Sequence, residues 1–190
     1  MQINIDIKDL LKNKKKSQIA EELIVDGCRK NNRKIQKQLY DRYCDAMFAV
    51  AYRIVNNYDV ANDALQEAFI QVFKDIKQFK GNSTLGAWIK TIVVRTSIKK
   101  IKKENTFTQL DIKQNGEMIS WPEEMRGADL EKAILALADG CRAIFLLIEV
   151  EGYKHKEVAE MLDISEGTSK SQLHYAKKQL QLLLKDYINR

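Results

Sequence analysis

The sequence predicts an all-α protein of two small helical domains joined by a flexible linker, with a helix-turn-helix in the C-terminal domain. One proline and eight glycines in 190 residues favour long, uninterrupted helices over a sheet with many turns. Apolar residues recur three and four positions apart in two separate stretches, 39–101 and 130–184. Between these stretches the periodicity is lost, and this segment contains Pro122, as expected of a linker.

Three helices are predicted in the first domain. The first runs from about Leu39 to Ile54, and Asn56, Asn57 and Tyr58 interrupt its pattern. The second runs from about Asp59 to Ile76 with a wide apolar face. The third follows the polar break Lys80–Thr84, where Ser83 or Asn82 is expected to cap it, and it ends in the lysine-rich run Lys99–Lys103. Residues before about Asn32 are polar and lysine-rich, with a short amphipathic stretch at Ile19–Val25, and they are expected to form a loosely held extension.

Four helices are predicted in the second domain, and the last two have the spacing of a helix-turn-helix. Ala159 is small enough for close helix packing, Asp163 stands where a left-handed turn is needed, and Ser165 can cap the following helix. The expected ranges are Leu130–Ala138, with Asp129 as cap, Arg142–Val150, Lys154–Leu162 and Glu166–Leu184.

The outward face of the last helix carries side chains that suit contact with a DNA groove. Glutamine can pair with adenine, lysine can reach guanine or phosphate, and serine bonds either kind of acceptor. The alternative is a helical hairpin whose polar face is merely solvated, and spacing alone does not decide between the two. The residues expected to face outward are Thr168, Lys170, Ser171, Gln172, His174, Lys177 and Lys178.

Charge and cysteine content narrow the partners and exclude some kinds of site. A formal charge of +6 favours a polyanion, either nucleic acid or an anionic membrane surface. Cys28, Cys44 and Cys141 are far apart and lie in no metal-binding spacing, so reduced thiols and no cofactor are expected. With no apolar run long enough to span a bilayer and no signal peptide, the protein is expected to be soluble and cytoplasmic.

Aromatic residues and cations also occur together between Phe79 and Lys103. Single-stranded DNA binding requires aromatic surfaces for bases and lysines for phosphates, and both are present here. In the competing interpretation, Trp88 belongs largely to the core and the lysine run is solvated.

Taken together, these segments resemble the extracytoplasmic-function branch of the bacterial sigma factor family, over about residues 24–103 and 128–185. The order and spacing of the short motifs make the resemblance specific. In the first domain they are Leu39-Tyr40-x-x-Tyr43, Asp63-x-x-Gln66-Glu67-x-Phe69, Phe79-x-Gly81-x-Ser83 and Trp88-Ile89-x-x-Ile92. In the second they are Glu151-Gly152-Tyr153, Glu157-Val158-Ala159 and Ile164-Ser165-x-Gly167-Thr168-Ser169-Lys170-Ser171.

The resemblance implies a domain division and a role for each part. Residues 1–23 would be an extension, 24–103 region two, 104–127 a linker and 128–190 region four. Region two would bind core RNA polymerase through Asp63, Gln66, Glu67 and Ile70. It would open and hold the minus-ten element through Lys80, Asn82, Ser83, Thr84, Trp88, Arg95, Lys99, Lys100, Lys102 and Lys103. Region four would read the minus-thirty-five duplex through Lys156, Thr168, Lys170, Ser171, Gln172, His174, Lys177 and Lys178.

Four departures from the family pattern stand out. Arg95 and Lys99 replace a common Asn and Asp and add positive charge beside the DNA, while Ala138 and Asp163 replace a common proline and glycine. The resemblance implies promoter recognition and melting, without catalysis, with core polymerase and promoter DNA as partners. An anti-sigma factor is a further partner that members of the family commonly have. The alternative is an autonomous helix-turn-helix regulator, which would leave the first domain unexplained.

Overall fold

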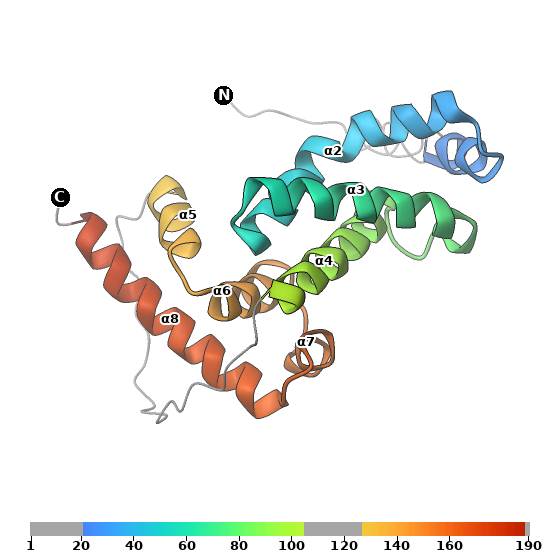
Figure 1. Ribbon diagram of the computed structural model, residues 1–190. Helices are drawn as coiled ribbons and strands as arrows, with labels where there is room; N and C mark the ends of the chain where they lie inside the picture. Colours follow the sequence, from blue (N-terminus) through green and yellow to red (C-terminus); the bar gives the residue numbers. More distant parts are fainter. Residues whose placement is uncertain (1–20, 105–126, 189–190) are drawn as a thin grey trace, which may run out of the picture.

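The computed structural model describes residues 21–104 and 127–188, with side-chain surroundings for 21–102 and 127–185. All regular structure in these two ranges is helical, which confirms the predicted fold class (Figure 1). We call residues 21–104 the first module and residues 127–188 the second module. The expected linker, including Trp121, lies outside the described residues. No described helix combines the length and the apolar character needed to cross a lipid bilayer.

The first module is built on three helices, α2 (Arg33–Val55), α3 (Tyr58–Asp75) and α4 (Leu85–Glu104), that run alternately up and down (Figure 1). The break between α2 and α3 lies where two asparagines were expected to interrupt the helix. Asn56 ends α2 in the left-handed conformation (φ 50°), which asparagine tolerates well. Asn57 then caps α3 by accepting the backbone amides of Asp59 and Val60.

The core of the first module comes from the apolar columns that predicted its helices. Leu39, Leu65, Val72 and Ile89 are almost completely buried where the three helices meet. After α3, the short 3₁₀ segment η1 (Ile76–Gln78) leads into the polar loop before α4. The expected capping residue is wrong, because the hydroxyl of Thr84, and not Ser83 or Asn82, accepts the backbone amide of Ala87 at 3.2 Å.

For residues 21–32 the expectation of a loosely held extension is also wrong, whereas the rest of that segment, residues 1–20, lies outside the described residues. Residues 21–29 are helical, and Val25 and Cys28 are buried against the first module. Gly27 permits this packing because a Cβ at that position would lie 2.2 Å from the Ile35 side chain. The short amphipathic stretch in this segment was the signal, but its two turns were too few to predict a helix from periodicity.

The second module contains α5 (Gly127–Leu135), α6 (Asp139–Phe145), α7 (His155–Leu162) and α8 (Glu166–Ile188), and α8 packs against the other three. The helix expected at Arg142–Val150 begins three residues earlier, and its last turns form the π-helix η2 (Leu146–Val150). Ala138 precedes α6 at φ −57° and ψ 144°, values that proline also adopts. The replacement of the family's proline therefore leaves the backbone unchanged.

The two modules are in contact, which differs from the expected picture of two units connected only by a tether. Helix α2 packs on α6, α4 packs on α7, and the buried apolar residues of both modules form one contiguous cluster. We call this contact the seam. A charged side chain, Arg142, is buried at the seam, and its guanidinium donates to the Ile54 carbonyl at 3.4 Å and to the Leu137 carbonyl at 2.7 Å.

Polar contacts surround the seam on its exposed side. The Asn56 side chain donates to the Leu135 carbonyl at 3.0 Å, and Arg53 lies 3.3 Å from the Glu131 carboxylate. On the α4 side, Lys90 pairs with Glu151 at 2.5 Å, and the Glu151 side chain is only 11% exposed. The periodicity of each helix predicted its own module, but it contains no information on which module surfaces meet.

Candidate polymerase and nucleic-acid interfaces

The turn between α7 and α8 has the geometry that the sequence predicted. Asp163 adopts the left-handed conformation at φ 59° and ψ 48°, and its backbone N–H donates to the Ala159 carbonyl. The Ser165 hydroxyl accepts the Thr168 amide at 2.9 Å, so it caps α8 as expected. These bonds set α8 across α7, as in a helix-turn-helix.

A further hydrogen bond, not expected from the sequence, fastens the two helices together. The His155 Nδ1 atom lies 2.9 Å from the Ser169 hydroxyl, which is completely buried. Ser169 belongs to a motif of the second domain, whereas nothing in the sequence singles out His155. Their separation of 14 residues gives no helical signal, so only the fold brings them together.

Most of the predicted α8 face is accessible, in line with contact to a DNA groove. Lys170 and Lys178 are exposed, while Thr168, Ser171, His174 and Lys177 are partly exposed. Lys156, on α7, is also exposed. Lys170 pairs with Glu166 at 2.8 Å, and Lys177 with Glu149 at 2.7 Å. The Lys170 ammonium lowers the pKa of the Glu166 carboxyl, chiefly through their hydrogen bond.

The expectation that Gln172 faces outward is wrong. Its side chain is only 2% exposed, and it lies on the same side of α8 as the buried residues Ser169 and Ala176. Positions 169, 172 and 176 are three and four residues apart, so they form one helical stripe. A polar side chain on a helix is normally expected to face solvent, and for this reason Gln172 was wrongly expected to face outward.

The loop that precedes α4 is fully open to solvent. Lys80, Asn82, Ser83 and Thr84 are all exposed, and Gly81 allows the turn at φ 74°. Trp88 is half-buried behind the loop, with its ring 5.3 Å from the ring of Phe79. The loop and its aromatic support therefore lie together, as a pocket for an unstacked base would require.

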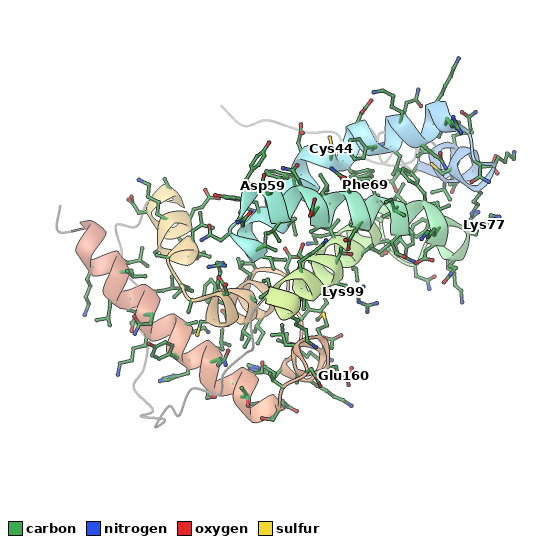
Figure 2. The ribbon with its side chains drawn as sticks, viewed as in Figure 1. Cys44, Asp59, Phe69, Lys77, Lys99 and Glu160 are labelled. Atoms are coloured by element: carbon green, nitrogen blue, oxygen red, sulfur yellow. The ribbon has the colours of Figure 1, made fainter. Side chains whose placement is uncertain are left out.

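Helix α4 continues from this loop as a cationic helix. Arg95 and Lys99 are exposed, and Lys99 lies near the C-terminal end of α4 (Figure 2). Lys100 forms an ion pair with Glu67 of α3, and Lys102 lies 3.9 Å from Asp163 across the seam. The side chain of Lys103 lies outside the described residues.

The polar face predicted on α3 is exposed along its whole length. Asp63, Gln66, Glu67 and Ile70 all face solvent, and Ile70 is 55% exposed. The opposite face of α3 is buried, with Ala64, Leu65 and Ala68 among its residues. A single exposed isoleucine is normal on a protein surface, so Ile70 is compatible both with a protein interface and with a solvated helix face.

The remaining chemistry of the described residues provides no evidence of a catalytic or metal site. Burial raises the pKa of the Cys28 and Cys141 thiols, so both remain protonated and unreactive at neutral pH. Within residues 21–102 and 127–185, no cluster of histidine, cysteine and carboxylate side chains could hold a metal ion. All three cysteines are free, as expected.

Comparison with known proteins gives matches in both modules. The family model "Sigma-70 region 2" matches residues 39–107, and "Sigma-70, region 4" matches residues 128–180, together more than half of the chain. The ECF RNA polymerase sigma factor SigW of Bacillus subtilis is 27% identical over 164 residues, covering 78% of this chain and 88% of that protein. The ECF sigma factor SigE of Mycolicibacterium smegmatis is 25% identical over 160 residues, covering 80% of this chain and 60% of that protein.

A solved structure supports the same relationship. The sigma factor RpoE of Bartonella quintana, crystallised with the anti-sigma factor NepR, aligns with a TM-score of 0.50 at 25% identity. The alignment covers 78% of this chain and 96% of that one. The two family regions match in the expected order, with region 2 on the helices of the first module and region 4 on the helices of the second module. The chain therefore belongs to the sigma-70 family, in its extracytoplasmic-function branch.

Proposed function

We propose that the chain is an alternative sigma factor that binds core RNA polymerase inside the cell and directs promoter recognition and melting. The observation that carries this proposal is the combination of three surfaces in one chain. A helix-turn-helix alone would suit any DNA-binding regulator, but the exposed α3 face and the open loop before α4 add a second and a third interface. Members of this family act as transcription factors rather than catalysts, and we propose the same for this chain.

The proposed roles follow the two modules. Residues 24–103 would bind polymerase through Asp63, Gln66, Glu67 and Ile70, and the loop with α4 would hold the opened minus-ten strand. Residues 128–190 would place α8 in the minus-thirty-five duplex, with Lys170 and Ser171 toward the bases and Lys178 toward phosphate. An anti-sigma factor is a further proposed partner, since the Bartonella relative was crystallised with one.

Co-purification separates this proposal from an autonomous regulator. A sigma factor forms a stoichiometric complex with core polymerase and supports initiation from a promoter that the core alone ignores. A regulator binds duplex DNA without polymerase. Transcript sequencing after forced expression would then reveal both promoter elements as a shared upstream sequence. A chain that binds DNA but never co-purifies with polymerase would contradict the proposal.

The α3 face provides the first sharp test. Asp63→Lys reverses a charge on an exposed surface, so we expect polymerase affinity to fall by about tenfold or more while the fold is retained. Asp45→Lys is the matched control, because Asp45 is an exposed acid of the same module on α2. Surface plasmon resonance gives the affinities, and circular dichroism checks the fold. An equal loss of polymerase affinity in both variants would contradict a specific role of the α3 face in binding polymerase.

The α8 face provides the second test. Lys170→Ala should cost about 1–3 kcal/mol of promoter discrimination if the ammonium contacts a base edge. Lys185→Ala is the control, since Lys185 is an exposed lysine on the same helix, far from its N-terminus. Polymerase affinity should be unchanged in both. Unaltered transcription from the cognate promoter with Lys170→Ala would exclude this base contact.

A further inference from the structure

One end of the first module gathers cations, of which only Lys80 belongs to a predicted interface. The Arg29 guanidinium donates to the Phe79 carbonyl at 2.7 Å, which ties the end of the 21–29 segment to the loop before α4. The start of α2 lies at the same end of the molecule, where Figure 2 shows Lys77 projecting from η1 (Figure 2). We call Arg29, Arg33, Lys34, Lys77 and Lys80 the cationic end.

These cations are not neutralised by nearby acids. All five are exposed. Among the described residues, none of Arg33, Lys34, Lys77 and Lys80 forms an ion pair with a carboxylate. Three acids lie near these cations along the chain. Asp26 already pairs with Lys30 at 2.7 Å and Asp41 with Lys37 at 2.6 Å. The Asp75 carboxylate accepts hydrogen bonds from the Gln71 and Gln78 side chains, and this single charge leaves the five cations in excess. The cationic end therefore presents a positive potential to solvent.

The position of two of these cations is unfavourable for the helix that carries them. Arg33 and Lys34 stand in the first turn of α2, which contains no acidic residue. The N-terminus of a helix has a partial positive charge, so cations in the first turn are repelled and acids are preferred. Capping is supplied by Asn32, whose side chain accepts the amides of Lys34 and Ile35. The stability of α2 therefore does not explain why Arg33 and Lys34 occupy its first turn.

A nucleic-acid strand fits this surface better than a membrane does. A membrane-binding surface combines cations with several apolar side chains, but Leu23 is the one large apolar residue among 21–34 that is strongly exposed. The cationic end is instead continuous with the exposed loop at Lys80. A strand held by that loop would bring its next phosphates toward η1 and the start of α2.

We propose that the cationic end binds the phosphate backbone of single-stranded DNA that leaves the loop before α4, and so extends the strand contact beyond the predicted minus-ten set. The inference rests on the proposed function, because it assumes that this loop holds an opened strand. With no exposed aromatic ring among its five residues, the site contacts phosphates and reads no bases. Its contribution is therefore the same for every sequence and depends strongly on salt.

The test is the salt dependence of binding by the full chain to a fluorescent single strand of mixed sequence, measured from low salt upward. Each lost phosphate contact flattens the plot of log K against log salt by about 0.7 for a single strand. The double variant Arg33→Gln with Lys34→Gln should therefore flatten the slope by about 1.4. Lys132→Gln with Lys185→Gln removes the same charge from exposed sites on the second module and should leave the slope unchanged.

Four outcomes would overturn the inference. The first two are an unchanged slope for the Arg33 and Lys34 double variant, and no binding of the wild-type chain to the single strand even at low salt. The third is a double variant whose slope flattens on a duplex probe but not on the single strand. The fourth is a double variant that still binds the single strand like the wild type but no longer binds vesicles of phosphatidylcholine and phosphatidylglycerol. Failure of the proposed function is recognised separately, as wild-type chain that does not support initiation with core polymerase. An unchanged slope in the double variant, together with intact initiation by the wild-type chain, would contradict the inference about the cationic end but not the proposed function.

Discussion

At the scale of single residues, buried polar side chains are where the sequence was least informative. Gln172 and Arg142 both look like surface residues by type, yet they are 2% and 1% exposed. Arg142 stands in the apolar run Cys141–Leu147, and this was the only signal of its burial in the sequence. Only the fold brings its guanidinium to the partners that satisfy it, which are backbone carbonyls and the Asp139 carboxylate.

Arg142 provides a test of how much this buried network contributes. Arg142→Leu would leave the Leu137 and Ile54 carbonyls without their donor, and we expect the free energy of unfolding to fall by about 3 kcal/mol. The control is Arg53→Leu, which removes a half-exposed arginine from the same seam and should cost less than about 1 kcal/mol. Urea denaturation measures both. Similar losses for the two arginines would mean that the Arg142 bonds contribute little.

At the scale of helices, local chemistry predicted most of what the structure shows. The Asn56–Asn57 break, the Asp163 turn and the Ser165 cap all depend on neighbouring residues, and all three are confirmed. One local error concerns the cap of α4, which is Thr84, the residue next to the expected Ser83. The larger error occurred where distant contacts decide. Residues 21–29 form a helix because Val25 and Cys28 are buried against the module, and such packing overrides a weak local pattern.

The Asp163 turn gives a prediction at this scale. A β-branched residue is strained at φ 59°, so Asp163→Val should destabilise the protein by about 1–2 kcal/mol. Asp163→Gly should change stability by less than about 0.5 kcal/mol, because glycine adopts this φ freely but also loses more entropy on folding. Thermal unfolding followed by circular dichroism distinguishes them. Glu160→Val, on the exposed side of α7, controls for helix propensity.

At the scale of the whole molecule, the closed seam is the feature that the sequence did not predict. The two promoter elements are about 25 base pairs apart by their names, or roughly 85 Å at 3.4 Å per base pair. A compact protein of this length is only about 40 Å across. Since the modules touch, they cannot reach both elements at once in this arrangement. Binding to both elements therefore requires the seam to open.

The ion pair between Lys90 and Glu151 allows this opening to be tested. Lys90→Glu places two carboxylates together at the seam, so we expect the radius of gyration, measured by X-ray scattering, to rise above the compact value of about 16 Å. Adding Glu151→Lys restores opposite charges and should restore the compact value. A double-mutant cycle on unfolding should give a coupling of about 1 kcal/mol. Failure of the swap to reverse the expansion would show that this pair does not hold the modules together.

The ion pair between Glu67 and Lys100 has a consequence for the order of assembly. One partner lies on the face proposed for polymerase and the other on the helix proposed for the opened strand. If polymerase draws Glu67 into its own contacts, the Lys100 ammonium becomes available to a phosphate, and capture of the strand by Lys100 likewise releases the carboxylate. Thermodynamic linkage makes the two effects equal in size, and an exposed pair limits them to about 1 kcal/mol, or several-fold in affinity. Each ligand would thus modestly strengthen the grip of the protein on the other.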